Sequence, residues 1–113
     1  MKDEAVYLRH LLECIERIER YTKEGRAAFR ASTLIQDGVI RNLQTLGQSV
    51  LKLSETLKAA HPEVNWKSIV GLRNVLVHDY LGLQMTRVWE IVAQDLPALK
   101  AQVTAIQASL PSA

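Results

Sequence analysis

Residues 33–60 read TLIQDGVIRNLQTLGQSVLKLSETLKAA, and this stretch decides the fold. Its apolar residues recur every three or four positions, which is the spacing of a helix with one buried face. They are Ile35, Val39, Leu43, Leu46, Val50, Leu53 and Leu57. Thr33 followed by Gln36 is a capping-box signature. We therefore expect one long helix over 33–60, which would form the spine of a helical bundle.

Apolar residues at helical spacing also precede this stretch. Residues 4–21 form an amphipathic pattern, and residues 26–31 form a short Ala-rich piece that Phe29 would anchor. Cys14 lies beside the apolar stripe of the first segment and has no His neighbour in the sequence. We interpret it as a small core residue and not as a nucleophile.

Two further helices are expected after the long one. Asn65 can cap the first of them, which should end at Gly82. Thr86 can cap the last helix, which Pro97 should kink or restart with Asp95 as a local cap. No segment shows the alternating pattern of a β-strand. The sequence thus predicts a single all-α domain over residues 1–113, an up-and-down bundle of four long helices plus a short one.

Composition narrows the classes of function. The net charge of +2 is only mildly basic, so dense non-specific binding of nucleic acid is not indicated, although a local basic pocket is compatible with it. No Cys/His cluster has the spacing of zinc ligands, so a protein without metal is expected. No apolar run approaches the roughly 18 residues that span a bilayer. We expect a cytoplasmic protein that does not contact membranes.

Residues 71–80, GLRNVLVHDY, concentrate polar side chains on an apolar helical background. Arg73 offers a planar set of donors that suits phosphate, and His78 can give and take protons near neutral pH. Asn74 can orient either of them. This combination suits chemistry on a phosphodiester.

Helix geometry separates the two main candidates. Arg73 and His78 diverge by about 140° and by about 7.5 Å along a straight helix. Either the helix changes course near His78, or a second copy of the chain completes the site across a two-fold axis. We favour completion by a second copy of the chain, assisted by a change in the course of the helix near His78.

The long helix carries further candidates. Gly47 costs roughly 1 kcal/mol of helix propensity relative to Ala, so it would mark close approach of another helix or of a partner chain. Arg41, Asn42, Gln44 and Gln48 lie off the apolar seam. They either form a solvated face, or Arg41 or Gln48 lines the same cleft as Arg73.

The spacing of Arg73, His78 and Tyr80 resembles the signature of the HEPN superfamily, and within it the HepT-like toxins of toxin-antitoxin pairs. The resemblance extends over nearly the whole chain. It includes Arg41-Asn42-Leu43 with Leu46-Gly47, Trp66 ahead of Gly71-Leu72-Arg73-Asn74, Trp89, and Asp95-Leu96-Pro97. One departure is Gly47-Gln48-Ser49, where relatives often carry Gly-Glu-Ala.

This resemblance implies a homodimer in which Arg73 and His78 of both protomers face one cleft. It implies a metal-independent endoribonuclease without a cofactor, acting on tRNA or mRNA. It also implies a minimal nucleotidyltransferase as the antitoxin, which would add AMP to Tyr80 and silence the nuclease. In this scheme His78 serves as acid and base and Arg73 holds the phosphate, with Asn74 and Asp79 in supporting roles.

Other interpretations of the same residues stay open. Arg73 could pair with Asp79 or a distant Glu, His78 could be a hydrogen-bonded core residue, and Tyr80 could pack in an interface. A different class of function is also compatible with the sequence. The chain would then be a non-catalytic, dimeric helical subunit that binds a nucleotidyltransferase or its nucleotide substrate.

Overall fold

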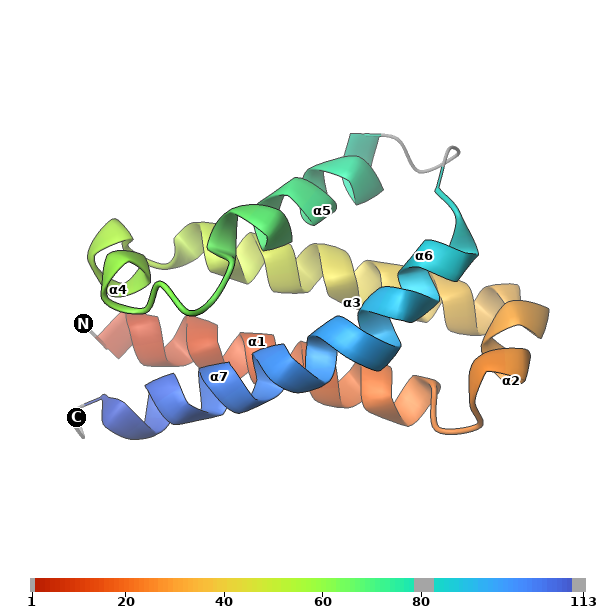
Figure 1. The fold of residues 1–113 in the computed structure, drawn as a ribbon, viewed down its shortest axis with the longest axis horizontal. Helices are drawn as coiled ribbons and strands as arrows, with labels where there is room; N and C mark the ends of the chain where they lie inside the picture. Colours follow the sequence, from red (N-terminus) through yellow and green to blue (C-terminus); the bar gives the residue numbers. More distant parts are fainter. Residues whose placement is uncertain (1, 79–82, 111–113) are drawn as a thin grey trace.

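The computed structural model describes residues 2–78 and 83–110, and all regular elements in these ranges are helical (Figure 1). The first half of the chain forms α1 (Lys2–Tyr21), the short α2 (Arg26–Ala31) and α3 (Thr33–Lys52). A short α4 (Glu55–Ala60) leads to α5 (Trp66–His78). The last part forms α6 (Met85–Glu90), the π-helical turn η2 (Ile91–Asp95) and α7 (Leu96–Ser109).

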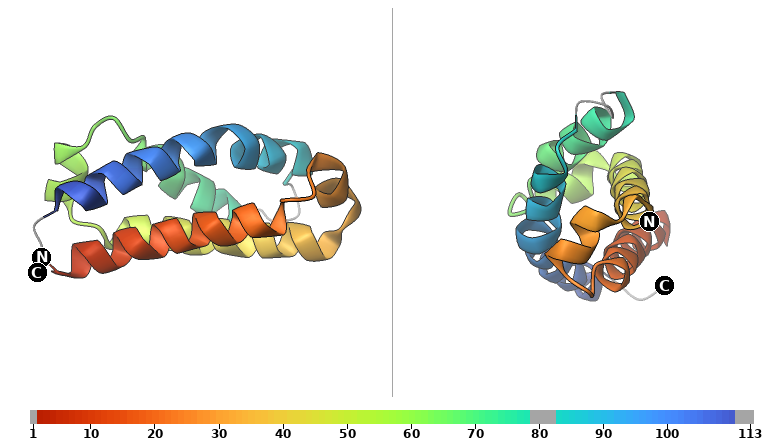
Figure 2. Two further views of the ribbon diagram at one scale, coloured as in Figure 1. Left: turned by 90° about the horizontal axis from the view of Figure 1, so that it is seen from below. Right: turned by 90° about the vertical axis from the view of Figure 1, so that its right-hand side faces the viewer.

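The long helices surround one apolar core. α1 packs against both α3 and α7, and α3 also packs against α5, as the end-on view in Figure 2 shows. The fully buried residues come from every long helix and from the short helices α2 and α6, because each presents one apolar face inward. They are Leu8, Leu11, Ile15, Ile18, Phe29, Val39, Val50, Leu76, Val88 and Val103. The prediction of an all-α bundle is confirmed.

The expected continuous helix over 33–60 is wrong, because the chain leaves helical geometry at Leu53 and Ser54. Ser54 caps α4, since its hydroxyl accepts a hydrogen bond from the Leu57 backbone N–H at 3.0 Å. The Glu4 carboxylate accepts from both the backbone N–H and the hydroxyl of Ser54, at 2.9 and 2.6 Å. A residue of α1, fifty positions away in the sequence, thus helps to set the break.

The start of α3 also differs from the expectation. Ser32 is the capping residue, and its hydroxyl accepts from the Ile35 N–H at 3.1 Å. Gln36 does not complete a capping box with Thr33. Its side-chain amide instead donates to the carbonyl of Phe29 at 3.0 Å, which joins α3 to the preceding short helix.

The C-terminal helices begin differently from the prediction. α6 begins at Met85 without a side-chain cap, so Thr86 is not its cap. Asp95 makes no capping hydrogen bond either, although a new α-helix does start beside Pro97 as expected. The expected helix end at Gly82 lies outside the described residues. Within residues 2–78 and 83–110, no helix is both long and apolar enough to cross a membrane.

Candidate active site

The N-terminal end of α5 is held by hydrogen bonds to the preceding turn. Asn65 caps the helix as predicted, because its side-chain oxygen accepts from the Ser68 N–H at 3.2 Å. Trp66 is buried, and its indole N–H donates to the carbonyls of Lys58 and His61 at 3.2 and 3.0 Å. Trp66 therefore anchors α5 in the core, and α5 enters the bundle in a defined orientation.

The apolar face of α5 decides where its polar side chains point. Leu76 is fully buried, and Ile69 and Leu72 pack partly against the core. At about 100° per residue, this leaves Asn74 and His78 on the outer side of the helix, where both are exposed. Arg73 lies at the edge between these faces and is half-buried.

Arg73 lies against α3 at Gly47. A Cβ atom added to Gly47 would collide with the Cβ of Arg73 and would lie 2.8 Å from its Cγ. The prediction that Gly47 marks the close approach of another helix is therefore confirmed, and that helix is α5. On the outer side, a guanidinium N–H of Arg73 donates to the Asn74 side-chain oxygen at 3.1 Å. This contact orients the amide and the guanidinium together.

His78 is the last residue of α5 that the structure describes. The helix is regular up to this point, so Arg73 and His78 keep the divergence of about 140° expected for a straight helix. One chain therefore does not bring the half-buried Arg73 and the exposed His78 onto one face within Trp66–His78. Asp79 and Tyr80 lie outside the described residues.

The candidate cleft residues of α3 are both exposed, namely Arg41 and Gln48. The side chain of α3 that bonds to α5 is instead Gln44, whose amide donates to the Leu76 carbonyl at 3.1 Å. Gln44 and Asn42 were both expected off the seam. A solvated position is wrong for Asn42, which is buried and donates to the Gly38 carbonyl at 2.9 Å. The position of Gln44 three residues before Gly47, on the same side of the helix, was the signal that could have identified it.

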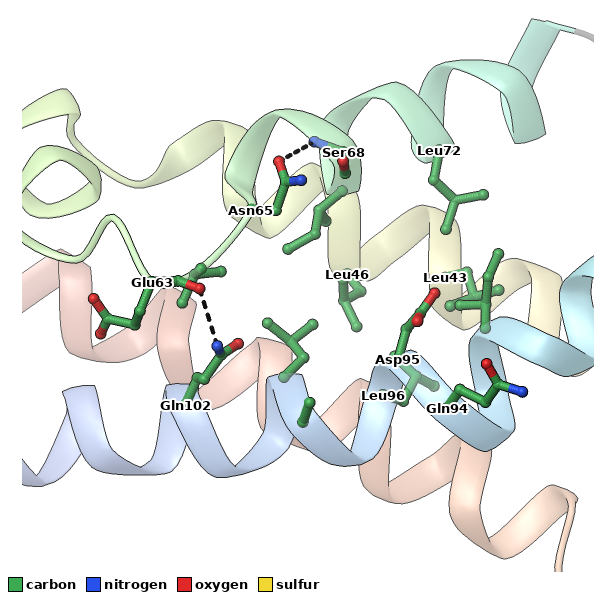
Figure 3. Close-up of a pocket in the computed structure, with 15 residues that line it drawn as sticks. Leu43, Leu46, Glu63, Asn65, Ser68, Leu72, Gln94, Asp95, Leu96 and Gln102 are labelled. Atoms are coloured by element: carbon green, nitrogen blue, oxygen red, sulfur yellow. Dashed lines mark hydrogen bonds between the residues drawn. The ribbon is translucent and has the colours of Figure 1, made fainter.

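Two cavities lie elsewhere. The first, of about 350 Å³, lies between α5 and α7, and Figure 3 shows its lining with α3 behind it. Its lining includes apolar residues such as Leu46 of α3 and Leu72 of α5, together with Glu63 and Asp95. The second, of about 420 Å³, is lined by Val75, Leu83, Gln84, Thr86, Arg87 and Glu90. The candidate residues Arg73 and His78 line neither of these two cavities.

An active site could also contain a metal ion or a nucleophilic side chain. In the part of the chain that the structure describes, no group of three or more His, Cys, Asp and Glu side chains could hold a metal ion. Cys14 is buried, and burial raises the pKa of its thiol, with smaller opposing effects from Arg17. It packs in the core as predicted.

Curated relatives of this chain indicate its class. The "Probable ribonuclease HepT" of Thermococcus cleftensis is 34% identical over 95 residues, which are 83% of this chain and 86% of that protein. The "mRNA nuclease HepT" of Shewanella oneidensis is 28% identical over 84% of this chain and 89% of that protein. A Methanocaldococcus jannaschii protein named "Gamma-glutamylcyclotransferase and putative RNase" is 34% identical over 96% of this chain, which spans 50% of its length. The class that these names share is the ribonucleases.

The family match is more specific than the class. A family model described as ribonuclease HepT-like matches residues 11–106, which include the helices that carry Gly47, Arg73 and His78. The chain belongs to the HepT-like ribonuclease family. No solved structure matches the chain significantly.

Proposed function

We propose that this HepT-like ribonuclease is a metal-independent endoribonuclease toxin that cuts RNA with Arg73 and His78 in the cleft of a homodimer. One observation carries the proposal. α5 presents the half-buried Arg73, whose guanidinium bonds to Asn74, and an exposed His78 five residues further along the same helix. An exposed imidazole can exchange protons with a substrate, and a guanidinium with restricted motion can hold a phosphate in place.

RNA carries its own nucleophile, which limits what the protein must supply. In the proposed reaction one imidazole takes the proton of the 2′-hydroxyl, and the resulting oxygen attacks the adjacent phosphorus. The bond from phosphorus to the 5′-oxygen breaks, and a second imidazole protonates that oxygen. The guanidinium of Arg73 stabilises the negative charge of the intermediate. The products are a 2′,3′-cyclic phosphate and a 5′-hydroxyl.

A second copy of the chain would supply the second imidazole. It would also place the His78 of one protomer near the Arg73 of the other, which the divergence along α5 prevents within one chain. The surface around these residues supports such a contact. Val75 and Val77 are 46% and 44% exposed, although valine side chains favour burial. Both lie within one turn of His78, but about 160° apart around α5, so a partner helix that packs beside His78 could cover one of them.

Regulation follows from the same surface. We propose that a minimal nucleotidyltransferase acts as the antitoxin and adds AMP to Tyr80, two positions after His78. The added nucleotide would bring bulk and negative charge next to the Arg73 and His78 pair, which would repel RNA. Arg41 and Gln48, exposed on the neighbouring helix, would extend the RNA-binding surface, and Asp79 would support His78. The substrate would be mRNA or tRNA in the cytoplasm.

The test is RNA cleavage by the partner-free chain with EDTA present, comparing wild type with His78→Ala. We expect wild type to cut a mixture of tRNA and mRNA and to leave cyclic phosphate ends, whereas His78→Ala should be inactive and equally helical. Intact mass first establishes that the chain carries no AMP. An unmodified wild-type chain that leaves RNA intact would contradict the proposal and would favour a non-catalytic subunit that binds a nucleotidyltransferase or its nucleotide.

A further inference from the structure

α3 and α5 approach most closely at Gly47. Its added Cβ would overlap the Cβ of Arg73 and would come within 3.6 Å of the Arg73 Cα. Other helical glycines are less restricted. Gly71 has no atom within 4 Å of such a Cβ, and at Gly38 the nearest atom belongs to the ring of Tyr21 at 3.1 Å. Among the described glycines, only Gly47 leaves no space for a side chain.

The effect of a side chain at position 47 depends on which atoms of Arg73 it would collide with. The Cβ of Arg73 is fixed to the backbone, so the arginine cannot avoid the contact by changing its side-chain rotamer. Carbon atoms in ordinary contact lie about 3.5–4.0 Å apart, so relief requires the two backbones to separate by about 1 Å. A side chain on Gly47 would therefore move Arg73 as a whole.

A second contact fixes the same pair of helices one turn away. Gln44 donates to the Leu76 carbonyl at 3.1 Å. Gln44 precedes Gly47 by three residues and Leu76 follows Arg73 by three, so the two contacts follow one antiparallel register. Gly47 sets the separation of the helices, and the hydrogen bond of Gln44 prevents them from sliding along one another.

We propose that Gly47 and Gln44 are positioning residues for the catalytic Arg73, which they hold at a fixed depth beside the RNA phosphate. This proposal rests on the proposed function of Arg73. Neither residue touches RNA in this scheme. A misplacement of about 1 Å in a group that stabilises a transition state can lower the rate about 100-fold. The effect should appear in kcat, because Arg73 acts most strongly on the charge that develops during the reaction.

The test measures kcat and KM for RNA cleavage by Gly47→Ala, with Gly38→Ala and Gly71→Ala as matched controls. Each variant adds one methyl group to a helix. We expect Gly47→Ala to lower kcat about 100-fold with KM changed less than about threefold, while both controls keep wild-type kcat. Helicity and oligomeric state are compared for all four proteins. A wild-type kcat in folded Gly47→Ala would overturn the proposal.

Two further variants keep the test decisive. If Gly47→Ala does not fold, Gln44→Met removes the hydrogen bond but keeps the length of the side chain, and an unchanged kcat in that variant would overturn the proposal. Arg73→Ala separates this proposal from the proposed function. Cleavage by wild type and none by Arg73→Ala upholds the function whatever Gly47→Ala does. Wild-type cleavage by Arg73→Ala would overturn the proposed role of Arg73 and its positioning together.

Discussion

Replacing Ser54 with Ala tests how the chain breaks between α3 and α4. The substitution removes the cap of α4, which contributes about 1 kcal/mol in other helices, with a range of about 0.5–2. It also removes the hydroxyl that donates to the Glu4 carboxylate at 2.6 Å. Hydrogen bonds to charged groups contribute roughly 1.5–3 kcal/mol, and we reduce this to about 0.5–1 because the contact is exposed. The bond from the Ser54 backbone N–H to Glu4 remains.

The expected loss is therefore about 1.5–2 kcal/mol in the free energy of unfolding, or roughly 6–10 °C in Tm for a domain of this size. Thermal unfolding followed by circular dichroism at one fixed protein concentration measures it, because association would otherwise shift Tm. Thr56→Ala is the control, since it changes an exposed residue inside α4. A loss below about 0.5 kcal/mol would refute the reasoning. A double-mutant cycle with Glu4→Gln isolates the bond between hydroxyl and carboxylate.

Two further predictions concern groups with shifted pKa values. Burial raises the pKa of the Cys14 thiol, so the folded chain should react with iodoacetamide at neutral pH at least about 1,000-fold more slowly than the chain in urea, as intact mass over time would show. Equal rates would place Cys14 outside the core. The hydrogen bond from Lys100 to Glu19, at 2.9 Å, raises the pKa of Lys100. Because this pKa is higher in the folded than in the unfolded chain, the interaction stabilises the fold at pH values below the ordinary pKa range of lysine. The stabilisation is lost as the pH rises through the pKa of Lys100 in the folded chain. The stability difference between wild type and Lys100→Met should therefore disappear in strong alkali, and a difference that grows with pH would contradict this.

The sequence predicted those parts of the fold that depend on local patterns. α1, α2 and the start of α5 follow from apolar spacing, from Phe29 and from the cap at Asn65. The break after Lys52 could not be predicted, because Leu53 and Leu57 keep helical spacing across it and both are buried. The contact between Ser54 and Glu4 helps to set the break, and no local pattern encodes it.

In the candidate site, too, local features could be predicted from the sequence and tertiary contacts could not. The types and spacing of Arg73, Asn74 and His78 were visible in the sequence, and so was the unusual glycine at position 47. The partner of Gly47 was not visible, because the pairing of α3 with α5 is a tertiary contact. Gln44 was assigned to the off-seam face for the same reason, since a polar residue that reaches another helix looks like a solvated one.

The π-helical turn at Ile91–Asp95 lets the helices before and after it bury differently oriented faces. Before the turn α6 packs near α2, where Trp89 contacts Phe29 with ring centroids 5.4 Å apart, and after it α7 packs on α1. One extra residue in a helical turn rotates everything beyond it by about 100°. A single-residue insertion or deletion here would therefore rotate α7 about the helix axis relative to α6. Without lengthening any loop, it would turn the buried face of α7 toward different neighbours and leave α6 in place.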